Sequence, residues 1–156
     1  MDAMNTNTIH RFSFGPWNIS EGADPFGPDM RKAYPHEKKF GLYKSLGFEG
    51  VQFHDDDVVP DIDSKSPSQI LEGTRQVKSI LDNEGLVPEF VAPRLWFAEQ
   101  TVDGGYTSNS ATDRDYAWER TKKSIDIAKE IGCGALVMWL AREGTYIREE
   151  RRQAFL

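Results

Sequence analysis

The stretch VQFHDDD, residues 51–57, decides the fold and contains the first candidates for chemistry. Alternate side chains of a strand share a face, so Val51 and Phe53 lie on one face, and Gln52 and His54 on the other. Helix-like segments precede and follow this stretch, which indicates a parallel sheet covered on both faces. An ionisable histidine on a covered face requires a reason. We expect His54 to lie at the C-terminal end of its strand, where parallel α/β barrels place their chemistry.

The rest of the chain alternates between strand and helix signals. Four short segments have the composition of strands, at residues 10–15, 50–55, 87–92 and 135–140. Helices are predicted after the strands, over residues 35–46, 66–85 and 112–132, with a fourth beginning at 148. In the third helix, Trp118, Ile125, Ala128 and Ile131 are predicted to form the apolar face, and Thr112 with Asp115 to form its capping box. The continuous apolar run at 135–140 predicts a strand buried on both faces.

Repeated strand-helix units predict an α/β fold of the TIM (β/α)8 barrel type. Such a barrel has eight strands and typically ~250 residues, so this chain would supply about the first four strand-helix units. Residues 1–9 are expected to form a flexible leader and residues 10–156 the half-barrel. A half-barrel exposes its inner face and two sheet edges. Either the chain is a piece of a longer protein, or it pairs with something that closes the sheet.

Bulk properties exclude several classes of protein. The formal net charge of -6 gives no electrostatic footprint for nucleic acid or an anionic membrane. No apolar run approaches membrane-spanning length, and the N-terminus has no apolar signal core. The single cysteine, Cys133, excludes an internal disulfide and fits a reducing cytosol. We therefore expect a cytoplasmic protein.

Five motifs together resemble the N-terminal part of xylose isomerase, and are most similar to the shorter-chain class of that family. They are FSFGPW at 12–17, DPFG at 24–27, FHDDD at 53–57, DGGYT at 103–107 and WLAREG at 139–144. Their order and spacing fit over residues 12–144, which is nearly the whole chain. The histidine and three aspartates that end the second strand are the most specific element.

The resemblance implies a metal-dependent aldose-ketose isomerase. The family interconverts chiefly D-xylose and D-xylulose, with D-glucose to D-fructose as a side activity, and forms homo-oligomers, commonly tetramers. It uses two divalent cations, Mg²⁺, Mn²⁺ or Co²⁺. Their ligands and the catalytic lysine lie on later strands, so no metal ligand is expected in this chain. Asp55 and Asp56 suggest a local ion site, but adjacent strand-end residues point in opposite directions, which does not suit the octahedral geometry of Mg²⁺.

The resemblance also implies roles for two residues of the strand end. His54 would contact the ring oxygen of the sugar and help to open the ring, and Asp57 would hold the imidazole. Histidine exchanges protons near neutral pH, and a neighbouring carboxylate fixes its tautomer and orientation. The residues alone leave an alternative open, in which His54 accepts a hydrogen bond within the core and residues 55–57 begin a loop.

Aromatic residues are the next candidates. Trp17 and Trp139 match tryptophans that wall the sugar pocket of the family, and Trp96 aligns with a pocket phenylalanine. Aromatic faces bind the apolar faces of sugars and exclude water. Phe26 matches a residue that the family inserts into the pocket of a neighbouring subunit. The alternatives are ordinary core packing for the tryptophans and a loop anchor for Phe26.

The sequence departs from the family pattern in one stretch near the predicted pocket. APRLW at 92–96 replaces a more polar threonine-asparagine-leucine-phenylalanine pattern, and its loop is one residue longer. Another sugar isomerase or epimerase of the same barrel group therefore stays open as an alternative. The exposed sheet edges and inner face keep open a second one, a non-catalytic half-barrel that needs a partner. Arg142 and Glu143 are interpreted as structural. The chain alone is not expected to turn over sugar.

Overall fold

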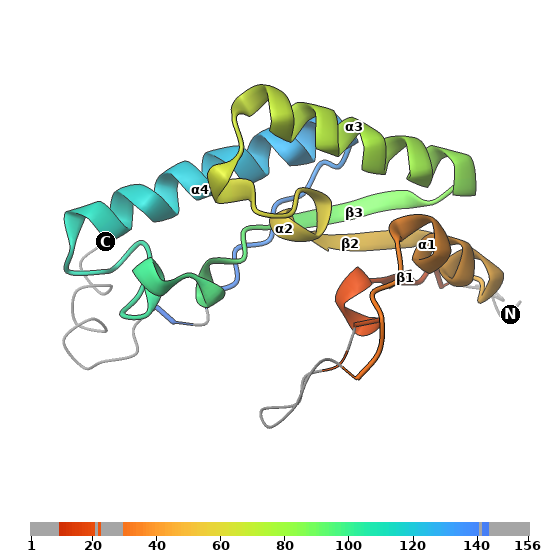
Figure 1. The fold of residues 1–156 in the computed structure, drawn as a ribbon, viewed down its shortest axis with the longest axis horizontal. Helices are drawn as coiled ribbons and strands as arrows, with labels where there is room; N and C mark the ends of the chain where they lie inside the picture. The colour runs from red at the N-terminus through yellow and green to blue at the C-terminus, as the bar shows by residue number, and fades with distance from the viewer. Residues whose placement is uncertain (1–9, 21, 23–29, 141, 144–156) are drawn as a thin grey trace, which may run out of the picture.

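A computed structural model describes residues 10–20, 22, 30–140 and 142–143. Over these residues the chain is an α/β fold with an open, parallel, three-stranded sheet in the order β1-β2-β3 (Figure 1). The strands are β1 (Ser13–Phe14), β2 (Gly50–His54) and β3 (Val87–Ala92). The prediction of an α/β fold with parallel strands is confirmed. Closure into a barrel is not seen within the described ranges.

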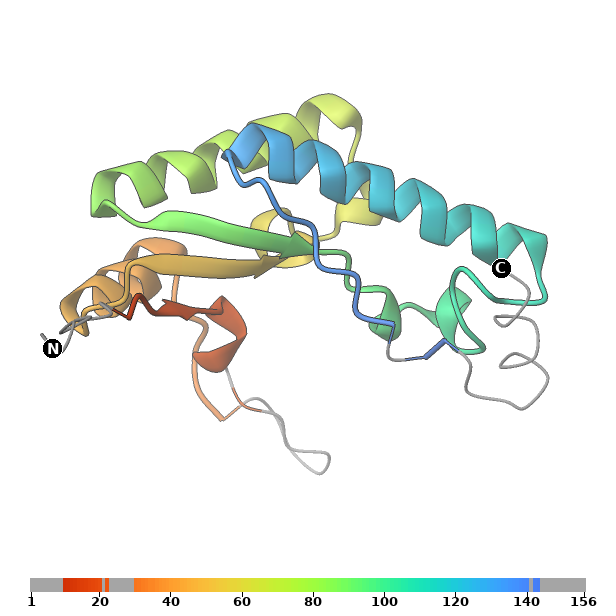
Figure 2. The ribbon, with the colours of Figure 1, turned by 180° about the vertical axis from the view of Figure 1, so that it is seen from behind.

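Four α-helices accompany the sheet in the described part of the chain. They are α1 (His36–Ser45), α2 (Asp55–Val58), α3 (Pro67–Glu84) and α4 (Ala111–Ile131). Single 3-10 turns are η1 (Pro16–Asn18), η2 (Ile62–Ser64), η3 (Leu95–Phe97) and η4 (Glu99–Thr101). The long helices α3 and α4 lie side by side along one face of the sheet (Figures 1 and 2). Within the described ranges, none of the helices combines the length and the apolar character that crossing a membrane requires. The predicted helix at 148–156 lies outside the described residues.

The ends of α3 follow from its own sequence. Ser66 caps the helix: its Oγ accepts a hydrogen bond from the backbone N–H of Gln69 (3.4 Å), and its own N–H donates to Oε1 of Gln69 (2.9 Å). Gly85 ends the helix in the left-handed conformation, with φ of 64°. Both signals are local, which explains why the sequence predicts them correctly.

The two faces of β2 differ as its alternation predicts. Val51 and Phe53 are fully buried and belong to one core cluster with the apolar side chains of α1, α3 and α4. On the other face, Nε2 of Gln52 donates to Oγ of Ser13 (2.8 Å) and to Oε2 of Glu89 (3.0 Å). The expectation of a sheet covered on both faces is wrong for the described residues. Helices cover one face, and the other carries hydrogen-bonded polar groups that remain partly in water.

The segment after α4 does not form the predicted fourth strand. It meets β3 at one parallel bridge, where the N–H of Val91 donates to the carbonyl of Ala135 (3.2 Å) and Val137 donates to Val91 (2.9 Å). Trp139 and Leu140 are 60% and 52% exposed. The expectation of a strand buried on both faces is therefore wrong here. A parallel strand of this composition needs neighbours on both sides, and this segment has one among the described residues.

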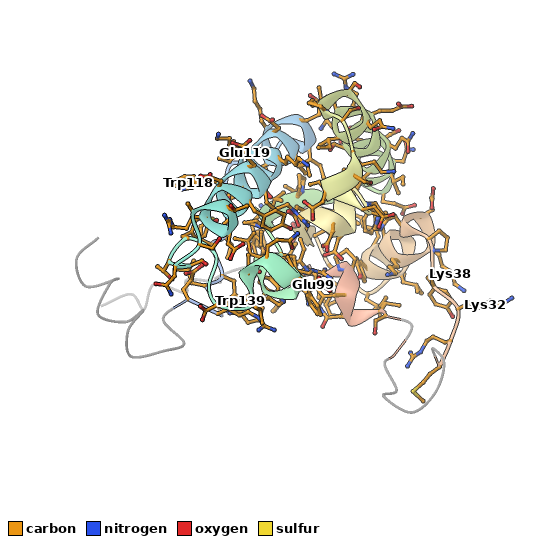
Figure 3. The ribbon with its side chains drawn as sticks, turned by 60° about the vertical axis from the view of Figure 1, so that its left-hand side comes forward. Lys32, Lys38, Glu99, Trp118, Glu119 and Trp139 are labelled. Atoms are coloured by element: carbon orange, nitrogen blue, oxygen red, sulfur yellow. The ribbon has the colours of Figure 1, made fainter. Side chains whose placement is uncertain are left out.

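Helix α4 also differs from its prediction at its start and on its buried face. Ser110 is the cap, because its Oγ accepts from the N–H of Asp113 (3.3 Å), so the predicted Thr112–Asp115 capping box is wrong. Trp118 is 57% exposed and lies on the outer side of the helix (Figure 3). Ile125 is also exposed (49%), whereas Ala128 and Ile131 are buried as predicted. The buried face also contains Arg120, for which an ionic partner compensates the cost of burial.

Candidate functional site

His54 and Asp57 lie together where β2 ends and α2 begins. His54 is the residue that caps α2 and is 7% exposed. Its backbone N–H donates to Oδ2 of Asp57 (2.9 Å), and its Nδ1 lies 2.9 Å from the same oxygen. A separation of three residues brings the side chains into contact because the backbone turns from strand into helix between them. The pair thus combines a nearly buried imidazole with a carboxylate that fixes its orientation.

The carboxyl group of Asp57 is held in its charged form. Burial raises its pKa, but the hydrogen bonds from His54 and the positive charge of Arg94 outweigh burial, so the pKa of Asp57 is lowered. Its neighbour Asp56 behaves in the opposite way, because burial raises its pKa more than the charge of Arg94 lowers it. The two adjacent aspartates are therefore electrostatically distinct.

Arg94 is the site residue that the sequence does not reveal. It follows β3, and its Nη2 lies 2.8 Å from Oδ1 of Asp57 and 2.5 Å from Nδ1 of His54. Its Nε lies 3.1 Å from Oδ1 of Asp56. In the sequence this arginine is visible only as a departure from the family pattern. Its position one strand away from an acidic strand end is the signal that could have predicted the contact.

Asp55 has a structural role. Its side chain is fully buried, and Arg120 of α4 holds it through Nε (2.5 Å to Oδ2) and Nη2 (3.0 Å to Oδ1). The hydroxyl of Ser124 donates to the same carboxylate (2.9 Å), as does the backbone N–H of Arg94 (3.1 Å). Asp55 thereby fixes the end of β2 against α4 and against the loop that carries Arg94.

Two tryptophans flank the imidazole. The ring of Trp17, in η1, lies 4.2 Å from that of His54 between centroids, and the ring of Trp96, in η3, approaches edge-on at 5.2 Å. Trp139 does not reach the imidazole but lies 4.7 Å from Trp96 and is largely exposed (Figure 3). The structure therefore brings three of the predicted side chains, Asp57, Trp17 and Trp96, around His54, with Trp139 behind Trp96. Phe26 lies outside the described residues.

Arg142 and Glu143 connect the segment of Trp96 to the long loop before α4. Glu143 accepts hydrogen bonds from the backbone N–H groups of Gly105 (2.7 Å), Tyr106 (2.8 Å) and Thr107 (3.0 Å). Beside it, Nε of Arg142 donates to the carbonyl of Trp96 (2.9 Å). These contacts support the structural interpretation of Arg142 and Glu143.

The described residues do not fit a resident divalent cation at this site. Ligand atoms of His54, Asp56 and Asp57 lie within 4.8 Å of one another, which is the spacing of a metal site. However, the guanidinium of Arg94 already contacts all three side chains. A cation here would have to displace a permanently charged arginine from between its carboxylates. The expectation of no metal ligand in this chain remains a prediction.

No protein-family model matches this chain.

Proposed function

We propose that this chain is the N-terminal part of a TIM (β/α)8 barrel whose intact protein isomerises aldoses to ketoses, with D-xylose as substrate and D-xylulose as product. D-glucose to D-fructose would be a side activity. The observation that carries the proposal is the placement of His54. Its imidazole lies at the C-terminal end of a parallel strand, is oriented by Asp57, and is flanked by Trp17 and Trp96. In barrel enzymes this end of the sheet holds the active site.

The pair suits the opening of a sugar ring. A cyclic aldose opens when its anomeric hydroxyl loses a proton and its ring oxygen gains one. Nδ1 of His54 is occupied by Asp57 and Arg94, whereas Nε2 has no hydrogen-bond partner among the described residues. Nε2 is therefore the atom that would exchange a proton with the sugar. Positioned proton transfer of this kind contributes about 10²- to 10⁴-fold to a rate.

The tryptophans would contribute binding and water exclusion. Indole faces pack against the C–H groups of a sugar, and Trp17 and Trp96 approach His54 from different segments of the chain. Excluding water from this space would protect a later transfer of hydrogen between C1 and C2. Trp139 would extend the wall from behind Trp96. These side chains account for substrate binding and ring opening only.

The cofactors and partners of the proposal lie outside the described residues. Two divalent cations, Mg²⁺, Mn²⁺ or Co²⁺, would polarise the open-chain sugar when bound, through ligands elsewhere in the intact protein. The proposal includes a cytoplasmic homo-oligomer, a tetramer, in which Phe26 enters the pocket of a neighbouring subunit.

The test is an assay of the natural gene product with D-xylose and D-glucose in the presence of each of the three cations. We expect conversion of D-xylose that His54→Asn abolishes and that the matched control His10→Asn, at an exposed position, leaves unchanged. A panel of other aldoses and of ketose epimers would identify a different isomerase or epimerase of the same barrel group. Full activity in the His54→Asn variant would refute the proposed role of the imidazole.

The open sheet favours a second candidate, a non-catalytic half-barrel that assembles with a partner or with itself. Residues 137–140 are all at least 39% exposed although they are apolar, and a partner would cover them. Sedimentation distinguishes the candidates. A stable assembly of the natural gene product without isomerase activity would support the half-barrel, whereas an active enzyme would exclude it.

A further inference from the structure

Asp57 and Arg94 both contact Nδ1 of His54, although one is a hydrogen-bond acceptor and the other a donor. Nδ1 lies 2.9 Å from Oδ2 of Asp57 and 2.5 Å from Nη2 of Arg94. A carboxylate only accepts hydrogen bonds, and a guanidinium only donates them. In a neutral imidazole, Nδ1 donates when it carries the proton and accepts when it does not. It cannot satisfy Asp57 and Arg94 at the same time.

We propose that Arg94 is a positioning residue that selects the tautomer of His54 in which Nδ1 accepts from Arg94 and Nε2 carries the proton. The contact with Arg94 is assisted by a charge that arginine does not lose, and a proton on Nδ1 would bring two donors against each other there. The guanidinium cannot turn away easily, because Nη2 also binds Oδ1 of Asp57 (2.8 Å) and Nε lies beside Asp56 (3.1 Å).

In the selected tautomer Asp57 loses the ring nitrogen as a donor, but each of its oxygens keeps another one. Its Oδ2 already accepts from the backbone N–H of His54 (2.9 Å), and its Oδ1 accepts from Arg94. Both oxygens therefore keep a donor in the selected tautomer. The carboxylate would orient the ring through the backbone and through Arg94 rather than by accepting the ring proton itself.

The selected tautomer decides whether Nε2 of His54 donates or accepts a hydrogen bond. With the proton on Nε2, the imidazole donates a hydrogen bond to the ring oxygen of a sugar and polarises the bond that breaks when the ring opens; it does not give the proton up as a neutral ring, because imidazolate would result. With the proton on Nδ1, Nε2 would be an acceptor instead. The hydrogen bond from Nε2 to a sugar rests on the proposed function, whereas the tautomer itself is a property of the chain without substrate.

The test reads the tautomer directly from the ring nitrogens of His54. In the ¹⁵N-labelled chain, at a pH where the ring is neutral, ¹H–¹⁵N correlation spectra distinguish a protonated ring nitrogen from a bare one. We expect Nε2 to carry the proton in the unsubstituted chain and Nδ1 to carry it in Arg94→Gln, where Asp57 becomes the stronger partner. Arg94→Lys, which keeps a charged donor, should restore the original pattern in part. Arg75→Gln, which removes an exposed arginine paired with Glu130, is the matched control and should change nothing.

Two results would overturn the inference. One is a proton on Nδ1 in the unsubstituted chain, which decides the question even if a variant does not fold. The other is an unchanged tautomer in Arg94→Gln whose backbone spectrum remains dispersed. Both readings are made without sugar or metal, so an inactive natural gene product would refute the proposed function and leave the tautomer result standing.

Discussion

The guanidinium of Arg120 on α4 forms a buried ion pair with the carboxylate of Asp55, the residue that follows His54. Nε lies 2.5 Å from Oδ2, and the side chains of Arg120 and Asp55 are 6% and 0% exposed. Nη1 of the same arginine binds Asp63 (2.7 Å). A helix and a strand end that are 65 residues apart in the sequence are thus joined beside the candidate site.

Arg120→Met should destabilise the fold strongly. It leaves the carboxylate of Asp55 buried without its cation, a change that typically costs about 3–5 kcal/mol. The free energy of unfolding in urea measures the effect. The double variant Asp55→Leu/Arg120→Met should lose less than the sum of the two single variants, because no charge is then left unpaired. The control Arg75→Met removes the exposed pair with Glu130 and should cost no more than about 1 kcal/mol.

Asp57 should make the stability of the fold depend on pH in the acid range. Its folded pKa is lowered from 3.8 by the hydrogen bonds from His54 and by Arg94, against the effect of burial. A lowered folded pKa contributes stability that is present above the unfolded value and is lost as the pH falls through the folded value. Asp56, with its pKa raised by burial, has the opposite sign.

The comparison of Asp57→Asn with the unsubstituted chain isolates this effect. The difference in the free energy of unfolding should be largest near neutral pH and should shrink below about pH 4, as Asp57 is protonated in both states. Asp115→Asn, at an exposed position on α4, controls for the change in net charge. A difference that stays constant over this range would contradict the assignment of a lowered pKa to Asp57.

Gly15 should be required for the position of Trp17. A Cβ added at Gly15 would overlap the indole ring of Trp17, which lies 4.2 Å from His54 between ring centroids. Gly15→Ala should therefore displace the indole and change the tryptophan fluorescence of the chain. The change should be absent when Trp17 is already phenylalanine. Gly134→Ala is the matched control, because no atom lies within 4 Å of the added Cβ.

Glu143→Gln should loosen the loop before α4. The carboxylate accepts from three consecutive backbone N–H groups, those of Gly105, Tyr106 and Thr107. Hydrogen bonds to a charged group contribute ~1.5–3 kcal/mol each, so loss of the charge should speed hydrogen exchange at these amides by at least about tenfold. Glu99→Gln, on η4, is the control (Figure 3). Unchanged exchange at the three amides would show that Glu143 does not hold the loop.

Local signals predict much of this fold. The alternation of residues 51–54 predicts which face of β2 is buried, and Ser66, Gln69 and Gly85 predict both ends of α3. The contact between His54 and Asp57 is also local, since three residues separate them across one turn of the chain. Each of these features depends on neighbours within a few positions, which is the range over which the sequence alone is informative.

The tertiary structure decides the features that depend on distant segments. Arg94 reaches Asp57 across 37 residues and Arg120 reaches Asp55 across 65; the only signal for the first pairing is that Arg94 follows the neighbouring strand, and the second has none in the spacing of the sequence. The same reason explains the errors. Trp118 is exposed because the ion pair with Asp55 turns Arg120 toward the sheet, and residues 137–140 are exposed because burial of a parallel strand requires neighbours on both sides. The sequence by itself determined three strands, the helices α1, α3 and α4, and the candidate imidazole. Packing over long separations determined which charges surround that imidazole.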